Sequence, residues 1–162
     1  MAAAFKCSNA PLSSMYDAIL VPTDGSEGTA KTLEHAIEMA QHHDATIHAL
    51  SVVDERKYQS LPDERRDEGR DTMERRAERA VAEVEMRAEE FDVDVVTAVR
   101  KGTPAERILD YTAQQGIDVV VIGTHGLSDH DQYVRLGSVT QRVVENASVP
   151  VFVVHMDGAG TA

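Results

Sequence analysis

The sequence predicts a three-layer α/β fold, a doubly wound sandwich in which helices cover both faces of a five-stranded parallel sheet. Two observations lead to this fold class. Short runs rich in Val, Ile and Leu alternate with helical patterns along the chain, in the order β-α-β-α-β-α-β-α-β. Several of these runs are also apolar at consecutive positions, which is typical of strands buried on both faces. Strands separated by helices pair in parallel through right-handed crossovers.

The first strand and helix lie near the start of the chain. Residues 16–24, "YDAILVPTD", contain a continuous apolar run that Pro22 ends, because proline has no ladder donor. Apolar residues then recur at helical spacing over residues 30–40, and Ser26 is the expected N-cap of this helix. The second strand is expected at residues 45–55, "ATIHALSVVDE".

A long helix and a third strand occupy the middle of the chain. Residues 62–90 consist mainly of Glu, Arg and Ala, with many acid–base pairs four positions apart, which indicates an amphipathic helix with a solvated charged face. The expected apolar stripe of this helix is Met73, Ala77, Ala80, Val81, Val84 and Ala88. The third strand is expected at residues 93–99, "VDVVTAV".

The next helix carries a full set of boundary signals. Thr103 is the expected N-cap, Pro104 occupies the first helical position and Glu106 the capping-box position. Gly116 ends the helix. Residues 117–123, "IDVVVIG", then form a fourth strand that is apolar on both faces.

The last helix and strand follow a glycine-containing loop. The helix "SVTQRVVENA" begins at Ser138, and Val139, Val143 and Val144 are expected to face inward. The fifth strand is "VFVVHM". No internal repeat or linker divides the chain, so we expect one domain at residues 15–156. The flanking residues, 1–14 and 157–162, are expected to be a poorly ordered leader and tail.

Composition narrows the functional classes. The net charge of −12 would repel a nucleic-acid backbone, and aromatic residues make up 4% of the chain, so neither DNA nor RNA is an expected partner. No apolar run is long enough to span a membrane. Cys7 has no second cysteine to pair with, which suits a reducing cytosol. Only four of the 16 basic residues are lysines, which is typical of a halophilic acidic surface; an acidic protein of no special habitat is the alternative.

A possible ligand site is indicated by the segment "GTHGLSDHDQYVRLGS", which begins at Gly123. In doubly wound sheets, ligands bind beyond the carboxyl ends of the strands where the strand order reverses. Glycines let the backbone approach a ligand, and the helix start at Ser138 offers N–H groups to a phosphate. Asp24, after the first strand, suits ribose hydroxyls because a carboxylate only accepts hydrogen bonds. The spacing alone equally allows a flexible loop with helix-capping residues.

Five stretches of the sequence resemble the universal stress protein family: "ILVPTDGSEGT", "VVDE", "GTPAERI", "DVVVIGTHG" and "LGSVTQRVVENASVPVFVV". They follow in the family's order and cover residues 16–154. The resemblance implies a sheet with strand order 3-2-1-4-5. It also implies a cytoplasmic homodimer that pairs through the last strand, Val151–Val154, and weak or absent hydrolysis, so that the protein is not an enzyme.

The resemblance extends to the family members that bind ATP, which carry the pattern Gly-x2-Gly-x9-Gly-Ser/Thr. Here Gly123, Gly126 and Gly137 match the glycines of this pattern, and Ser138 matches its final Ser/Thr. By this resemblance Asp24 would bind the ribose and the backbone of Ile47 would meet the adenine edge. Phosphates would lie against the glycines and the helix start. The implied cofactor-binding residues are Pro22, Thr23, Asp24, Ile47, Gly123, Thr124, His125, Gly126, Gly137, Ser138 and Val139.

The loop departs from the family pattern in length and charge. Ten residues rather than nine separate Gly126 from Gly137, and they include Asp129 and Asp131. Two carboxylates would repel a triphosphate unless Mg²⁺ or Mn²⁺ lay between them. His125 and His130 with these aspartates could also suggest a transition-metal site, but neighbouring loop residues rarely all point inward.

The sequence therefore supports two hypotheses. The first is a homodimeric stress-response regulator that binds ATP or a related adenine nucleotide, and in which the nucleotide acts as a switch on a downstream protein. The second is a dimeric interaction module, or a chaperone-like one, that binds no nucleotide. A slow ATPase is a variant of the first hypothesis.

Overall fold

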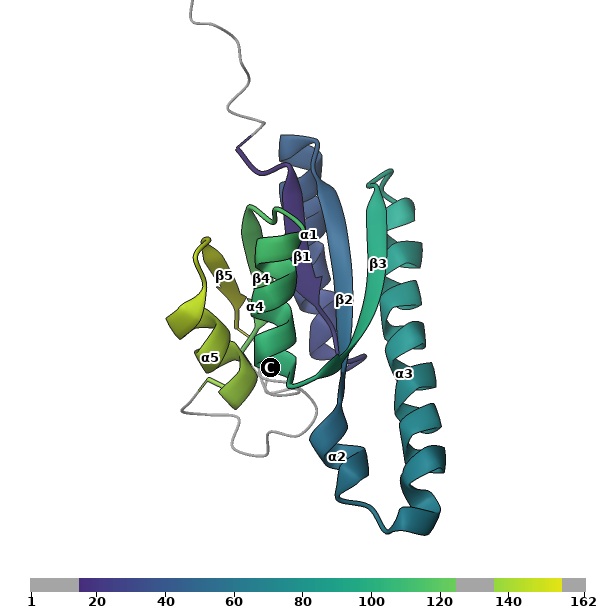
Figure 1. The fold of residues 1–162 in the computed structure, drawn as a ribbon. Helices are drawn as coiled ribbons and strands as arrows, with labels where there is room; N and C mark the ends of the chain where they lie inside the picture. The colour runs from purple at the N-terminus through teal and green to yellow at the C-terminus, as the bar shows by residue number, and fades with distance from the viewer. Residues whose placement is uncertain (1–14, 125–135, 156–162) are drawn as a thin grey trace, which may run out of the picture.

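A computed structural model describes residues 15–124 and 136–155, which form a five-stranded parallel sheet with the order β3-β2-β1-β4-β5 (Figure 1). The strands are β1 Ala18–Pro22, β2 Thr46–Asp54, β3 Val95–Gly102, β4 Val119–Gly123 and β5 Val151–Val154. Both the predicted fold class and the strand order that the resemblance implied are confirmed.

Helices cover both faces of this sheet, as expected. They are α1 Gly28–His43, α2 Glu55–Gln59, α3 Asp63–Glu89, α4 Pro104–Gln114 and α5 Ser138–Asn146. Helices α1 and α3 pack on one face of the sheet, and α4 and α5 pack on the other (Figure 1). Within the described part of the chain, no helix is both long and apolar enough to cross a bilayer.

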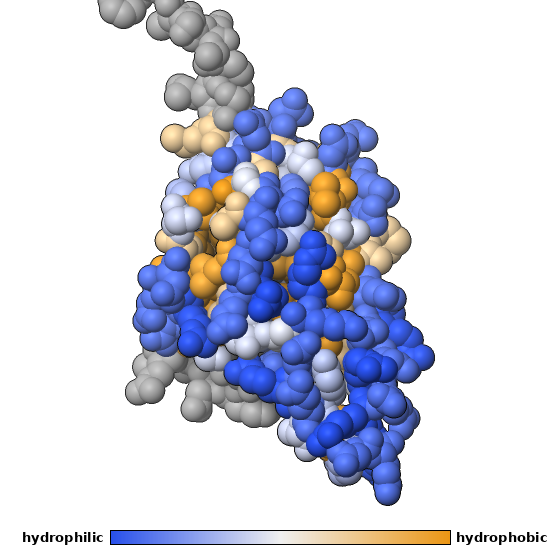
Figure 2. Space-filling model, in the orientation of Figure 1, coloured by the Kyte–Doolittle hydropathy of each residue, from blue (hydrophilic) through white to orange (hydrophobic). Residues whose placement is uncertain are grey.

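Two apolar cores result, one on each face. Alternate residues of a strand point to opposite faces, so Ile19 and Val21 pack beneath α1 and α3 while Leu20 packs beneath α4 and α5. All three side chains are fully buried. Figure 2 looks onto the α4 face, where most of the visible surface is hydrophilic and apolar side chains show on either side of α4. Val96, on edge strand β3, is 45% exposed.

The strand order reverses beside β1, and this reversal opens the sheet edge. Strand β1 lies between β2 and β4, and its pairing with β2 runs from Ala18–Thr46 to Pro22–Leu50. Strand β2 continues beyond that point to Asp54, where it still pairs with β3. At their carboxyl ends, β2 therefore extends past β1 and leaves one side of its backbone without a neighbouring strand.

The connection between β2 and β3 contains a helix that the sequence did not predict. The Asp54 side chain accepts a hydrogen bond from the Arg56 N–H (3.1 Å) and so caps the short helix α2. Helix α3 then starts beyond the carboxyl edge of the sheet and runs back along it (Figure 1). Its predicted apolar stripe is buried from Ala77 to Ala88, whereas Met73 is half-buried.

Two local expectations about helices were wrong, and the predicted N-cap at Thr103 was confirmed. Helix α1 begins at Gly28 with Glu27 as its N-cap, because Ser26 belongs to the preceding turn. Thr103 does cap α4, but its side chain makes no capping hydrogen bond there. Val144 is 41% exposed rather than buried, since α5 has only one side against the sheet and Val143 occupies it.

Candidate functional site

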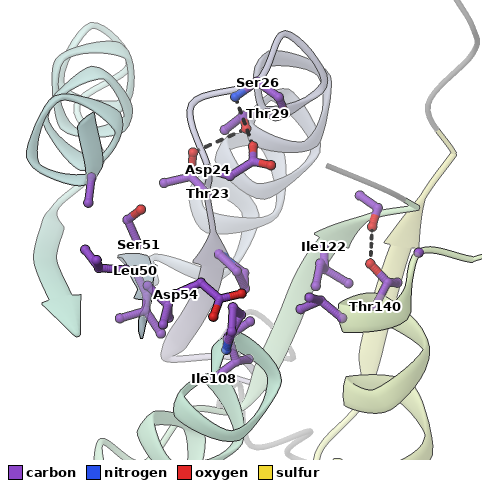
Figure 3. A pocket seen from close by; sticks show the side chains of 18 of the residues that line it. Thr23, Asp24, Ser26, Thr29, Leu50, Ser51, Asp54, Ile108, Ile122 and Thr140 are labelled. Atoms are coloured by element: carbon purple, nitrogen blue, oxygen red, sulfur yellow. Dashed lines mark hydrogen bonds between the residues drawn. The ribbon is translucent and has the colours of Figure 1, made fainter. Parts of the chain in front are cut away.

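A cavity of about 460 Å³ lies at the carboxyl edge of the sheet, where β1 and β4 diverge. Figure 3 shows the ends of β1, β2 and β4 and the starts of α4 and α5 around it. Its lining residues in the described chain are Pro22, Thr23, Asp24, Ser26, Thr29, Thr32, Leu50, Ser51, Val52, Val53, Asp54, Arg56, Lys57, Met73, Arg76, Ala77, Pro104, Ile108, Ile122, Gly123, Gly137, Ser138, Val139 and Thr140.

The turn after β1 presents a carboxylate to this cavity. The buried Thr23 hydroxyl accepts a hydrogen bond from the Gly25 N–H (3.2 Å) and lies 3.2 Å from the Thr29 hydroxyl. Asp24 accepts a hydrogen bond from the Ser26 N–H (2.9 Å), which closes the turn, and Gly25 has φ +78°. The turn is thereby held in place, and the exposed Asp24 carboxylate lies on the lining of the cavity (Figure 3).

The end of β2 presents open backbone to the same space. Residues of a strand alternate in the side to which their N–H and C=O point. The Leu50 carbonyl points to β1, since it accepts a hydrogen bond from the Thr23 N–H (2.8 Å). The backbone N–H and C=O of Val52, two residues later, point to the same side. They lie beyond Pro22, where β1 has ended. One N–H and one C=O of Val52 therefore face the cavity.

Ile47 does not belong to this site, and that expectation is corrected. It lies near the start of β2, and its N–H donates to the Asp94 carbonyl (2.9 Å), on the β3 side. Its side chain is fully buried under α1 and α3. Ile47 does not line the cavity; Val52, five residues later, presents the open backbone edge that the resemblance had assigned to Ile47.

The end of β4 and the start of α5 form the other side of the cavity. The Thr140 hydroxyl donates to the Gly123 carbonyl (2.8 Å), and the Gly137 N–H donates to the Thr124 carbonyl (2.7 Å). These two bonds fix the first turn of α5 against β4. Gly137 is the N-cap and has no side chain, so the first N–H groups of α5, at Ser138 and Val139, are not covered by a cap. The positive end of the helix dipole therefore faces the cavity.

A buried carboxylate and an exposed arginine form an ion pair on the lining of the cavity. Asp54 is 7% exposed and binds Arg56 through two side-chain contacts, at 2.9 Å to Nε and 2.8 Å to Nη2. These hydrogen bonds hold the pKa of the Asp54 carboxyl below its usual range, although burial opposes the shift. Asp54 is therefore ionised at neutral pH and its charge is balanced by Arg56.

Most of the predicted site residues meet at this cavity. Those that line it are Pro22, Thr23, Asp24, Gly123, Gly137, Ser138 and Val139. Thr124, directly after β4, is buried and is not among the lining residues. His125 and Gly126 lie outside the described residues, as do Asp129 and Asp131. In the described part of the chain, no three His, Cys, Asp or Glu side chains cluster as metal ligands would.

Sequence reasoning missed the residues that the end of β2 and the β2–β3 connection contribute. Val52, Asp54, Lys57 and Arg76 all line the cavity. For Val52 and Asp54 a signal was present, since "VVDE" is one of the family-like motifs. For Arg76 the signal was a charge in α3 without acidic neighbours at helical spacing.

Comparisons with known proteins agree with this architecture. The sequence pattern of the Universal stress protein family matches residues 15–155. The universal stress protein MJ0531 of Methanocaldococcus jannaschii is 35% identical over 141 residues, which cover 86% of this chain and 82% of that protein. The structure of MJ0577, another protein of that organism, superimposes with a TM-score of 0.79 at 28% identity, covering 90% of this chain and 99% of the other.

Two more distant structures share the fold and were solved with nucleotides. A universal stress protein of Archaeoglobus fulgidus in complex with dAMP has a TM-score of 0.64 at 18% identity, with 86% of this chain and 98% of that chain covered. A universal stress protein in complex with cAMP has a TM-score of 0.62 at 20% identity, with coverages of 86% and 97%.

Proposed function

Because the chain belongs to the universal stress protein family, we propose that it binds an adenine nucleotide, ATP, in the cavity at the carboxyl edge of the sheet. One observation carries this proposal: open strand backbone, a carboxylate and an uncapped helix start converge on a single cavity of about 460 Å³. These three features match the three parts of a nucleotide. The complexes of distant relatives with cAMP and dAMP agree with that ligand class.

The base would lie against the end of β2. Adenine offers an acceptor, N1, beside a donor, the 6-amino group, on one edge. The N–H and C=O of Val52 provide the complementary donor and acceptor, because β1 ends before it can pair with them. Half-buried Met73 and buried Ala77 of α3 add apolar surface for the base.

The ribose would bind Asp24, and the phosphates would bind the start of α5. Asp24 can accept hydrogen bonds from ribose hydroxyls. The N–H groups of Ser138 and Val139, together with the Ser138 hydroxyl, are donors at the positive end of a helix. We expect Mg²⁺ or Mn²⁺ to accompany a triphosphate, because Asp129 and Asp131 in the same loop of the sequence would otherwise repel it.

Calorimetric titration with ATP and Mg²⁺ tests this function. The wild-type protein is expected to bind, and Asp24→Asn to bind about tenfold more weakly, because a hydrogen bond to a charged acceptor is replaced by a neutral one. Asn can still accept the Ser26 N–H bond that closes the turn. Asp44→Asn is the matched control, since Asp44 ends α1 at the opposite edge of the sheet and has φ 54°, which Asn tolerates.

A flat titration of the wild-type protein would contradict nucleotide binding. The alternative, a dimeric interaction or chaperone-like protein with an unused cavity, would then be favoured. Equal weakening by Asp24→Asn and Asp44→Asn would show that the substitutions act through the fold in general, and not through the ribose contact.

The proposed role is that of a regulator and not of an enzyme. The nucleotide would act as a switch through the segment 126–137, of which residues 126–135 lie outside the described part of the chain, and so alter the surface offered to a downstream protein. Limited proteolysis within that segment should slow when ATP and Mg²⁺ are added; an unchanged cleavage rate would rule the switch out. Phosphate release that persists in Gly137→Val would come from contaminating ATPase.

We propose a cytoplasmic homodimer that pairs through β5. This strand is one edge of the sheet, and Phe152 on it is 45% exposed, with its ring centroid 5.8 Å from that of His35. Pairing with the β5 of a second copy would give hydrogen-bond partners to the backbone N–H and C=O groups on the edge of the sheet, and it would cover Phe152. Light scattering should give the dimer mass for the wild-type protein and a monomer for Phe152→Glu. A wild-type monomer at micromolar concentration would contradict this arrangement.

A further inference from the structure

We propose that Arg76 of α3, with Lys57 of α2, forms a second anion-binding subsite in the cavity, and that it takes a phosphate carried on the 2′- or 3′-hydroxyl of the ligand's ribose. The inference rests on the proposed function, since it concerns the same nucleotide. It predicts that the cavity prefers ribose-phosphorylated adenine nucleotides to those with 5′-phosphates alone.

The charge of Arg76 has no partner on its own helix. Oppositely charged residues three or four positions apart support each other on a helix. Every other arginine of α3 has an acidic residue at such a position, and Arg66 and Arg70 form ion pairs in this way. The corresponding neighbours of Arg76 are Thr72, Met73, Arg79 and Ala80.

The charges around the cavity leave two cations available. Of its lining residues in the described chain, Arg56, Lys57 and Arg76 are basic and Asp24 and Asp54 are acidic. Asp54 and Arg56 bind each other at 2.8 Å, and Lys57 contributes only at longer range to the low pKa of Asp54. No ion pair joins Lys57 or Arg76 to any described residue. In a chain of net charge −12, a cavity whose described lining carries one more basic than acidic residue favours an anionic group.

The position of Arg76 indicates that the anionic group it would bind is attached to the ribose. A Cβ atom on Gly25 would lie 3.5 Å from the Cβ of Ala80, so α3 passes directly beside the turn that carries Asp24. Arg76 lies one helical turn before Ala80, towards the end of α3 that projects past the sheet, and it lines the cavity. It therefore flanks the proposed ribose-binding carboxylate from the α3 side.

The start of α5 lies on the other side of the same carboxylate. In Figure 3, Thr140 and Ile122 border the cavity opposite Ser51 and Leu50 of β2, with Asp24 between the two sides. Phosphates on the 5′ carbon would face α5, so Arg76 and Lys57 are left for a second phosphate. One ribose hydroxyl would carry that phosphate, and the other would remain for Asp24.

Calorimetry with three small nucleotides tests this subsite. The probes are AMP, adenosine 3′,5′-bisphosphate and adenosine 2′,5′-bisphosphate, at low ionic strength because exposed charges are screened by salt. At least one bisphosphate should bind about tenfold more tightly than AMP, the effect of about one charge-assisted contact. Which bisphosphate binds more tightly identifies the hydroxyl.

Matched variants then identify the residue. Arg76→Gln should abolish the preference for the bisphosphate, so that the ratio of the Kd values for AMP and the bisphosphate falls to about one. Arg75→Gln removes the same charge from the adjacent residue of α3, which has acidic neighbours at Asp71 and Glu78 and does not line the cavity. This control variant should keep the preference for the bisphosphate. Arg76→Lys should restore part of it. Thermal unfolding of both Gln variants checks that the fold is retained.

The outcomes separate this inference from the proposed function. AMP and ATP binding without any preference for a bisphosphate would overturn the subsite alone. A preference that survives in Arg76→Gln, or is lost equally in Arg75→Gln, would also overturn it. No binding of any probe, ATP included, would overturn both proposals.

Discussion

Replacement of Val52 by proline would remove a single N–H from the cavity wall. In β2, residues 47, 49, 51 and 53 point their backbone polar groups to β3, as the bond from the Ile47 N–H to the Asp94 carbonyl shows. Val52 points to the opposite side, beyond the last β1–β2 pair at Pro22–Leu50. The substitution therefore removes no hydrogen bond between strands, and the proline ring would project into the space where we place adenine N1.

The expected loss of affinity follows from that lone donor. A buried acceptor left without its donor costs about 1–3 kcal/mol, so the Kd for ATP should rise by roughly 5–150-fold in Val52→Pro. Isothermal titration calorimetry measures this, with urea unfolding as the check on folding. Val52→Thr is the matched control, since it changes the side chain and keeps the N–H, and its Kd should stay within about twofold of the wild type.

Two results would refute the reasoning about Val52. If Val52→Pro bound ATP as tightly as the wild type, the base would not use this part of β2. If the free energy of unfolding fell by more than about 3 kcal/mol in Val52→Pro while Val52→Thr stayed stable, the N–H would belong to the sheet and not to the cavity.

Three further predictions concern the fold and its surface. His48 lies on β2 with its Nδ1 2.9 Å from the Tyr111 hydroxyl, and burial lowers the pKa of His48 below its model-peptide value of 6.5. Since the unfolded chain binds a proton there more readily, stability should fall as pH drops through about 6.5, and urea unfolding should show a smaller loss between about pH 7 and 5 in His48→Gln. An equal loss in both proteins would exclude His48 as the cause. Thr140→Val removes the bond to the Gly123 carbonyl and should lower the free energy of unfolding by about 1 kcal/mol and weaken ATP binding; retained affinity would mean that α5 is positioned without it. The net charge of −12 predicts a melting temperature that rises with KCl concentration, and a melting temperature independent of KCl would argue against a halophilic surface.

The sheet was predictable because its strands differ strongly from their surroundings. The runs around Ile19, Val120 and Val153 are apolar at consecutive positions and are separated by helical patterns, and the structure pairs them in parallel. Asp24 and the glycine at position 137 were also found from sequence, since their chemistry and their place after a strand or before a helix are both visible there.

The remaining part of the site depends on spatial relations that a one-dimensional pattern does not contain. Which residue of β2 faces the cavity depends on where β1 stops. The register between β1 and β2 shows that this residue is Val52 and not Ile47. The approach of α3 to the turn at Gly25, through Ala80, and the place of Arg76 on the cavity lining depend on how α3 crosses the sheet. Helix α2 went unpredicted because its five residues are held by one cap at Asp54 and not by an apolar stripe.

Amide chemical-shift mapping by NMR tests the central claim most directly, that the cavity at the carboxyl edge binds an adenine nucleotide. On titration with ATP and Mg²⁺, the account predicts the largest shifts at the amides of Val52, Asp24, Ser138 and Val139, with little change at Asp44 and Ile47. An unchanged spectrum at millimolar ATP, or shifts concentrated away from β2, the β1–α1 turn and α5, would contradict it.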